Sequence, residues 1–264
     1  MKLGFIGCGN MAGAMVGGIL KNNLIPAGEI IASTLRAESL EKVRKTYGIC
    51  TEPDNRAVAR ESGILVLGVK PQYYQQVIEE IKDSVREDQI VVSIAPGKTL
   101  EWLEMNFGKP MKLVRCMPNT PALVGEGITG VCCNERVSEQ ELNRVCEILS
   151  GCGQTEVLAE HLLDVVVSVS GSSPAYVFMF IEAMADAAVA DGMPRAQAYK
   201  FASQAILGSA KMVLETGKHP GELKDMVCSP GGTTIEAVRV LEEKGFRSAV
   251  IEAMKACVRK GKGM

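Results

Sequence analysis

A short apolar run that leads directly into a glycine-rich turn, at the very start of the chain, most constrains the fold. Lys2–Ile6 has the length and composition of a buried strand, and residues 7–12 (GCGNMA) follow it immediately. A helical pattern then continues to about Asn23, with apolar residues at helical spacing. A strand, a tight glycine turn and a helix together predict the opening unit of a nucleotide-binding α/β domain.

The same alternation of strand and helix patterns continues through the first 159 residues. Further runs typical of strands lie at 29–33, 48–51, 64–69, 89–95, 112–117, 127–133 and 154–158, and helical patterns separate most of them. This βαβ alternation predicts a parallel sheet with right-handed crossovers. We therefore expect an α/β Rossmann-type domain over residues 1–159.

The character of the sequence changes after about Glu160, where strand-like runs become scarce and helical periodicity dominates to the C-terminus. Residues 174–190 are apolar nearly all round, which in a soluble protein indicates burial on most faces. A helical region of only about a hundred residues is too small to bury such a helix alone. We therefore expect an all-α C-terminal dimerisation domain over residues 160–264, in which this helix packs against a second subunit.

Composition excludes several classes of protein. The chain has 264 residues with 29 basic and 31 acidic side chains, a net charge of −2, which argues against a nucleic-acid-binding protein. Nine scattered cysteines without a CxxC pair, and only two histidines, argue against a metal site and favour reduced thiols in a cytoplasmic protein. Glu182, Asp186 and Asp191 interrupt the most apolar stretch, which argues against a membrane span.

The glycine turn has the residues that a dinucleotide requires. Gly7 would allow the tight turn, Gly9 would let the backbone approach a pyrophosphate, and Ala12 would let the helix lie close to the strand. The helix N-terminus would add free amide groups and a positive dipole end.

The end of the second strand distinguishes between cofactors. A site for NADH usually has Asp or Glu there, to bind the ribose 2′-hydroxyl. This chain instead has Ser33-Thr34-Leu35-Arg36, whose hydroxyl groups and guanidinium suit a 2′-phosphate. We therefore expect NADPH, with NADH possible; the alternative for Arg36 is a solvated residue at a helix start.

Later strand ends add polar or rigid residues at the same edge of the sheet. Lys70 lies between Val69 and Pro71, and either faces the cofactor or is a solvated turn residue. The rigid loop at 117–121 (MPNTP) presents Asn119, whose amide both donates and accepts hydrogen bonds.

An unusual run, DMVCSPGGTTIEA at 225–237, lies in the helical half. Adjacent glycines leave backbone amides bare ahead of a helix, and Ser229, Thr233 and Thr234 add hydroxyl groups. Such an anion nest could hold a carboxylate without Arg or Lys. The alternative is an ordinary helix cap after a flexible turn.

This run resembles the signature of the pyrroline-5-carboxylate reductases. The resemblance extends to GFIGCGNMAGAM, VKP, MPNTP and SGSSPAY, and it covers essentially the whole chain in the family's order. It implies a cytoplasmic enzyme that reduces L-1-pyrroline-5-carboxylate to L-proline with NAD(P)H, the last step of proline biosynthesis. It also implies a homodimer with interlocked helical domains, or a higher assembly of such dimers.

The resemblance assigns roles to residues by motif, and Arg36 joins them because its guanidinium suits a 2′-phosphate. Those expected to bind the cofactor are Gly7, Gly9, Asn10, Met11, Ser33, Arg36, Asn55, Val69, Lys70, Pro71, Ala95 and Asn119. Those expected to bind the substrate are Asn119, Ser229, Gly231, Gly232, Thr233 and Thr234. Thr234 and Ser229 are expected to be catalytic, and either His161 or His219 is a weaker candidate acid.

Two other functions are compatible with part of the sequence. A β-hydroxyacid dehydrogenase shares the Rossmann-plus-helical plan, but such enzymes carry a catalytic lysine on the first long helix after the Rossmann domain, and Val169–Tyr176 has none. A non-catalytic NADPH-binding dimeric regulator would explain the glycine turn and the apolar helix. It gives no reason for the run SPGGTT.

Overall fold

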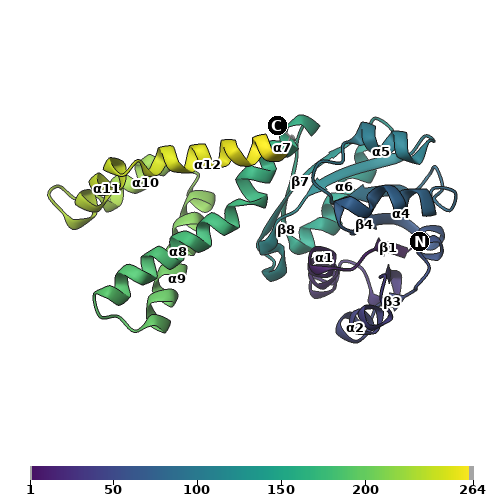
Figure 1. Cartoon of the computed structure of the whole chain (residues 1–264), viewed down its shortest axis with the longest axis horizontal. Helices are drawn as coiled ribbons and strands as arrows, with labels where there is room; N and C mark the ends of the chain where they lie inside the picture. Colours follow the sequence, from purple (N-terminus) through teal and green to yellow (C-terminus); the bar gives the residue numbers. More distant parts are fainter. Residues whose placement is uncertain (1, 262–264) are drawn as a thin grey trace. The chain divides into compact units, whose positions relative to one another are not determined.

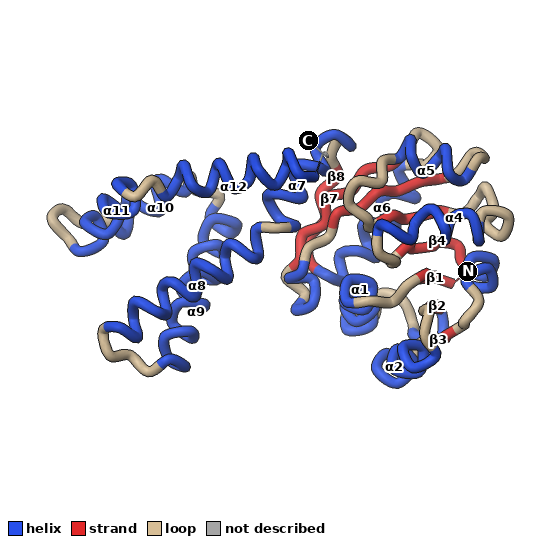
Figure 2. Tube along the Cα trace, viewed as in Figure 1, coloured by secondary structure: helices blue, strands red, loops and turns tan. Residues whose placement is uncertain are grey.

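The computed structural model describes residues 2–261. These form two compact units: the first comprises the residues up to Ser172 together with those from Cys257 onward, and the second comprises Ser173–Ala256. The first unit combines helices and strands, and the second consists of helices in the described residues (Figures 1 and 2). The expected fold class is therefore confirmed, whereas the domain boundary at Glu160 stays a prediction.

An eight-stranded sheet forms the centre of the first unit, in the order β3-β2-β1-β4-β5-β6-β7-β8. Its strands are β1 (Lys2–Ile6), β2 (Ile30–Ser33), β3 (Cys50–Thr51), β4 (Ser62–Leu67), β5 (Ile90–Ser93), β6 (Lys112–Met117), β7 (Gly127–Cys133) and β8 (Gly153–Val157). The order runs outward in both directions from β1 and β4. Their carboxyl ends therefore meet at the switch point where open α/β sheets bind ligands.

Helices cover both faces of the sheet. One face packs against α1 (Asn10–Lys21), α2 (Ala37–Tyr47) and α6 (Glu139–Leu149), and the other against α3 (Asn55–Glu61), α4 (Tyr74–Ile81), α5 (Leu100–Phe107) and α7 (Leu163–Val166). Because both faces are buried at the centre of the sheet, a central strand such as β5 is almost entirely apolar.

The expectation of a parallel sheet is wrong at the last two strands, β7 and β8. β7 pairs antiparallel with β6, with Arg115 opposite Cys132, and β8 pairs parallel with β7. Only residues 118–126 connect β6 to β7, and most of them form the short 3-10 helix η3 (Thr120–Val124). A parallel crossover needs about a dozen residues or more, usually with a helix across one face. This connection is too short, so the chain turns back.

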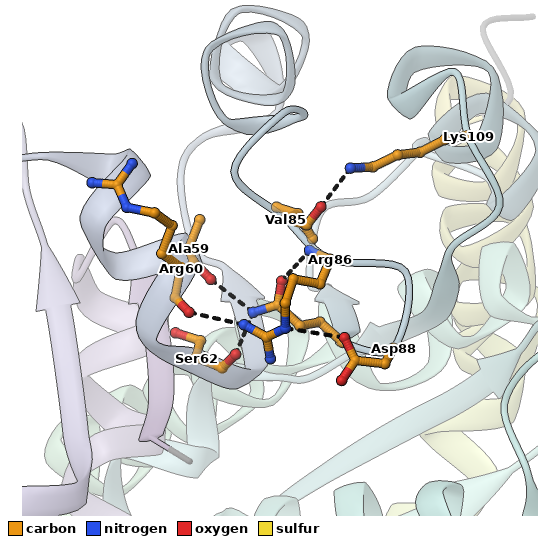
Figure 3. A network of polar contacts seen from close by, with 8 residues as sticks. Ala59, Arg60, Ser62, Val85, Arg86, Asp88 and Lys109 are labelled. Atoms are coloured by element: carbon orange, nitrogen blue, oxygen red, sulfur yellow. Dashed lines mark hydrogen bonds and ion pairs between the residues drawn. The ribbon is translucent and has the colours of Figure 1, made fainter.

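A polar network links residues at the amino ends of β4 and β5, on the side of the sheet opposite to the switch point (Figure 3). Gln89 is buried, and its amide donates to the carbonyl of Ala59 at 2.7 Å and to that of Ser62. The Arg86 amide donates to Gln89 Oε1 at 2.5 Å, and the Arg86 guanidinium donates to the Arg60 carbonyl at 2.9 Å. The network joins the end of α3 to the start of β5. It therefore stabilises the strands whose carboxyl ends form the opposite edge of the sheet.

The second unit exposes much of its apolar surface. Its helices are α8 (Ser173–Ala190), α9 (Arg195–Thr216), α10 (Pro220–Val227), α11 (Thr233–Glu243) and most of α12 (Phe246–Gly261). Phe178, Met179 and Phe180 follow one another on α8, yet they are 58%, 67% and 41% exposed. Three successive residues point in different directions around a helix, so the exposure extends around α8.

A longer helical stretch that ends with α8 meets the length and composition of a membrane span. One candidate stretch, Glu160–Ala190, occurs in the described residues, and 11% of its most apolar window is buried within the chain. An apolar surface of this extent requires a cover, either from lipid or from another protein surface.

Candidate active site

The glycine turn after β1 needs glycine at its first position. Gly7 has a φ of +86°, which residues with a side chain rarely adopt. A Cβ atom added to Gly7 would lie 2.7 Å from Val69 Cγ1 and 2.9 Å from the Val69 nitrogen. The Gly7 amide donates to the Ser33 carbonyl at 3.0 Å. The turn therefore packs between the carboxyl ends of β2 and β4.

Gly9 leaves the N-terminus of α1 open. It is the N-cap residue, and within the described part of the chain no side chain caps this helix or adds an acidic group to its first turn. A Cβ atom added to Gly9 would meet nothing within 4 Å, so there is open space beside Gly9, the residue that precedes the first amides of the helix, at Asn10 and Met11. Free amides and the positive end of a helix suit an anion. This cradle fits the pyrophosphate of a dinucleotide.

Cys8 lies inside this turn without adding charge. Burial raises the pKa of its thiol to about 11, so the group is neutral at physiological pH. A neutral thiol neither repels a phosphate nor acts as a nucleophile. Cys8 therefore leaves the binding of an anion to the backbone amides of the turn.

The end of β2 presents a polar group that sequence reasoning did not resolve. Ser33 is fully buried, and its hydroxyl donates to Asn55 Oδ1, on the first residue of α3, at 2.6 Å. Arg36 is exposed at the N-cap of α2, and its carbonyl accepts a hydrogen bond from Thr34 Oγ1 at 3.1 Å. A ligand at this edge can reach Arg36 and Asn55, whereas Ser33 acts through Asn55.

The ends of β4 and β5 are joined by a tyrosine that sequence reasoning missed. The Tyr74 hydroxyl donates to the Leu67 carbonyl at 2.5 Å and accepts from the Ile94 amide at 3.2 Å. Burial raises the pKa of Tyr74 to about 12, so the group stays a neutral donor. The repeated Tyr73-Tyr74 after Pro71 was the available signal, because a buried tyrosine needs a hydrogen-bond partner.

The residues expected beside the nicotinamide follow these two strands. Val69 is half-buried against Gly7, Lys70 is exposed, and Pro71 opens the short 3-10 helix η2 (Pro71–Tyr73). Ala95 is buried just after β5. All four lie along the carboxyl edge, in the same unit as the glycine turn.

Asn119 uses both ends of its amide within the protein. It is buried, its Oδ1 accepts from the Ile128 amide at 2.9 Å, and its Nδ2 donates to the Ser170 carbonyl at 3.1 Å. Ser170 lies in a π-helical turn, η6 (Val167–Gly171), just before α8. Such turns are frequent at functional sites. Asn119 therefore fixes the loop after β6 to this turn.

A buried arginine on β6 also escaped sequence reasoning. The Arg115 side chain is 4% exposed, and it lies 3.1 Å from Glu160 Oε1 and 3.4 Å from Asp164 Oδ1. The same Glu160 oxygen accepts from the Leu100 amide at 2.7 Å. A charged residue inside an apolar run was the signal, because a buried charge requires a partner.

The run SPGGTT forms a tight turn that opens α11 in the second unit. The Gly232 amide donates to the Ser229 carbonyl at 3.0 Å, and Gly231 has a φ of +66°. Gly232 is the N-cap of α11, and within the described residues no side chain caps it. Thr233 is exposed and Thr234 is half-buried. A bare helix N-terminus flanked by hydroxyl groups can receive a carboxylate.

The two histidines differ in their local structure. His219 is the N-cap of α10, and its Nδ1 accepts from the Gly221 amide at 3.0 Å. This hydrogen bond gives His219 a structural role as the cap of α10. His161 is exposed in the short 3-10 helix η5 (Glu160–Leu162), beside the ion pair of Arg115 and Glu160.

Comparison with known proteins decides the family. A relative from Escherichia coli (strain K12), named pyrroline-5-carboxylate reductase, is 55% identical over 259 residues, which cover 98% of this chain and 96% of the relative. The chain belongs to the pyrroline-5-carboxylate reductase family. A relative of the same name from Methanosarcina acetivorans is 42% identical over 96% of this chain and 94% of its own. The resemblance of the sequence motifs is therefore confirmed.

Two family models match separate parts of the chain. One described as pyrroline-5-carboxylate reductase dimerisation matches residues 160–264. Another described as NADP oxidoreductase coenzyme F420-dependent matches residues 2–97, which include the glycine turn and the strands around it.

Solved structures of this family have the same fold. The Coxiella burnetii pyrroline-5-carboxylate reductase has a TM-score of 0.93 at 36% identity, covering 99% of this chain and 97% of that one. The Plasmodium falciparum enzyme, with NADP bound, has a TM-score of 0.90 at 33% identity, covering 100% and 97%. A 3-hydroxyisobutyrate dehydrogenase from Mycobacterium tuberculosis, with a TM-score of 0.53 at 12% identity, covers 88% and 71% and shares the fold alone.

Proposed function

We propose that this protein reduces L-1-pyrroline-5-carboxylate to L-proline with NADPH, the last step of proline biosynthesis. The high identity to pyrroline-5-carboxylate reductases over nearly the whole chain carries this proposal. The chemistry of the described residues agrees with it. Both ligands are anionic, and the chain has an uncapped helix N-terminus for each, at α1 and at α11.

The substrate carboxylate would bind at the start of α11. There Gly232 and Thr233 offer backbone amides, Gly231 shapes the turn, and Ser229 adds a hydroxyl group. Held in this nest, the carboxylate would determine which face of the ring meets the hydride donor. Orientation of this kind supplies much of the rate enhancement of a bimolecular reaction.

The reaction does not require a strongly acidic side chain to protonate the substrate. When bound, NADPH supplies the hydride, and the imine needs only a polarised C=N bond. A cyclic imine has a pKa near neutrality, so the substrate can bind already protonated. Thr234 would hydrogen-bond the ring nitrogen, with Ser229 close by as a second hydroxyl. Glu236, the acid in the first turn of α11, is paired with Arg239 at 2.7 Å.

The cofactor would lie along the carboxyl edge of the first unit. Gly7, Gly9, Asn10 and Met11 would hold the pyrophosphate. Ser33, Arg36 and Asn55 would serve the adenosine ribose and its phosphate, with NADPH preferred over NADH. The residues that would border the nicotinamide half are Val69, Lys70, Pro71, Ala95 and Asn119.

The dimerisation region supports self-association. We expect the exposed apolar surface of α8 to be covered by a second copy of the chain, and not by lipid, because Glu182 and Asp186 interrupt the apolar stretch. A higher assembly of dimers, residence in the cytoplasm and the absence of nucleic-acid partners belong to the same proposal.

A substrate comparison tests the function against its main rival. The purified protein is incubated with NADPH and racemic pyrroline-5-carboxylate, and separately with NADP and 3-hydroxyisobutyrate, while nicotinamide absorbance is followed. We expect turnover with the imine alone. Oxidation of the hydroxyacid, without reduction of the imine, would instead favour a β-hydroxyacid dehydrogenase on the shared fold.

A further inference from the structure

Three side chains from three elements form a hydrogen-bonded chain at the carboxyl end of β2. Ser33 Oγ donates to Asn55 Oδ1 at 2.6 Å, and Asn55 Nδ2 donates to Glu80 Oε2 at 2.9 Å. Glu80 lies near the end of α4, and its backbone carbonyl accepts from Arg56 Nε at 3.1 Å. The Glu80 carboxylate is thus held against the residue that begins α3.

The direction of this chain follows from the Glu80 carboxylate. An ionised carboxylate accepts hydrogen bonds and cannot donate one, so only the Nδ2 end of Asn55 can face it. Asn55 Oδ1 must then face Ser33, whose hydroxyl becomes the donor. Glu80 therefore determines which way the Asn55 amide points, at the strand end where a dinucleotide places its adenosine ribose.

The orientation of Asn55 affects one ligand more than another. Asn55 is half-buried, and its Nδ2 carries a second hydrogen beyond the one donated to Glu80. A phosphate oxygen at neutral pH only accepts, so it requires this donor end. A ribose hydroxyl both donates and accepts, so it can bind either end of the amide.

We propose that Glu80 is a positioning residue for cofactor choice, which favours the 2′-phosphate of NADPH by holding the Asn55 amide with its donor end available. The inference rests on the proposed use of a nicotinamide dinucleotide. A purely electrostatic effect would have the opposite sign, because the negative charge of Glu80 repels a phosphate.

Binding of adenosine fragments tests this without turnover. Calorimetry gives dissociation constants for 2′,5′-ADP, which carries the 2′-phosphate, and for 5′-AMP, which has a free 2′-hydroxyl. In Glu80→Ala we expect 2′,5′-ADP to bind about fivefold more weakly, with less than about a twofold change for 5′-AMP. Glu80→Gln should recover only part of the loss. Its amide oxygen can still accept from Asn55, but its NH2 group can also donate, so the orientation of the Asn55 amide is no longer fixed.

Two controls separate orientation from charge and from folding. Glu79→Ala removes the neighbouring carboxylate, which is 69% exposed and pairs with Lys82, and it should leave both constants unchanged. In an Asn55→Ala background, Glu80→Ala should have no further effect on 2′,5′-ADP, since the two residues act as one unit.

Three results would overturn the proposal. Tighter binding of 2′,5′-ADP by Glu80→Ala and Glu80→Gln alike would show that charge repulsion governs the site. Equal loss of both nucleotides would show a structural role only, and unchanged constants would show no role. If the unmodified protein binds neither NADPH nor 2′,5′-ADP, it is the dinucleotide function itself that fails.

Discussion

The side-chain amide of Asn119 donates to the backbone carbonyl of Ser170 at 3.1 Å, across a separation of 51 residues in the sequence. Its other end accepts from the Ile128 amide at 2.9 Å. One buried side chain thus joins the loop after β6, the start of β7 and the π-helical turn before α8. The last two residues of this turn, Ser170 and Gly171, begin the SGSSPAY motif that the sequence shares with its family.

Replacing Asn119 tests this junction. In Asn119→Ala the Ser170 carbonyl and the Ile128 amide both lose a partner, so we expect the free energy of unfolding to fall by about 2 kcal/mol. Urea denaturation measures the change. Thr120→Ala, at the exposed neighbouring position, is the matched control and should change stability by less than about 0.5 kcal/mol. Equal stability of Asn119→Ala and the unmodified protein would contradict the assigned contacts.

The two glycines of the first turn should respond differently to alanine. Gly7→Ala places a side chain at a φ of +86° and against Val69, so the free energy of unfolding should fall by more than about 1 kcal/mol. Gly9→Ala meets no atom of the protein, so its melting temperature should stay unchanged. Its methyl group would occupy the pyrophosphate cradle and weaken NADPH binding by about tenfold or more. Unimpaired NADPH binding by a folded Gly9→Ala protein would exclude this cradle.

Thr234 is the hydroxyl group on which the proposed chemistry depends most. Thr234→Ala should lower kcat on pyrroline-5-carboxylate by more than about tenfold, because the ring nitrogen loses its hydrogen-bond partner. Thr234→Ser keeps the hydroxyl group and should recover most of the rate. Calorimetry should give the same dissociation constant for NADPH with the unmodified protein, Thr234→Ala and Thr234→Ser. Thr234 lies on α11, and none of the residues proposed to bind the cofactor is on that helix. Similar kcat values for Thr234→Ala and Thr234→Ser would remove the hydroxyl from the mechanism.

Tyr74 predicts a pH dependence of stability with a definite sign. Burial raises its pKa to about 12, whereas an unfolded tyrosine has a pKa of about 10. Between these values the folded state keeps a proton that the unfolded state releases, so stability falls as pH rises through this range. In Tyr74→Phe this contribution is absent. The stability advantage of the unmodified protein over Tyr74→Phe should therefore shrink from about pH 9 to about pH 11, and a constant difference would contradict burial of an unionised Tyr74.

Local patterns in the sequence predicted most of the elements. Lys2–Ile6 is β1 as expected, and the apolar segment at 174–190 lies within α8, since strand and helix periodicities are local properties. The directions of β7 and β8 differ from the prediction because the connection from β6 to β7 is too short for a parallel crossover. The exposure of α8 is consistent with the expected need for a second subunit.

Contacts between distant elements were beyond the reach of the sequence. Ser33 was correctly assigned to a strand end, but its burial depends on α3 and on the hydrogen bond to Asn55. Glu80 appeared as an ordinary charged residue of a helix, and only the packing of α4 brings it to Asn55. The spacing of residues along the sequence indicates which face of a helix or strand a side chain occupies. It does not indicate which residues of other elements that side chain contacts.

Transfer of a labelled hydride tests the central claim most directly. The purified protein is incubated with pyrroline-5-carboxylate and NADPH that carries deuterium at the transferable position, and the product is analysed by mass spectrometry and NMR. We predict L-proline with one deuterium, on the ring carbon that was the imine carbon, formed in proportion to the NADPH consumed. Unlabelled proline, or no consumption of NADPH in the presence of the imine, would contradict the proposed reduction.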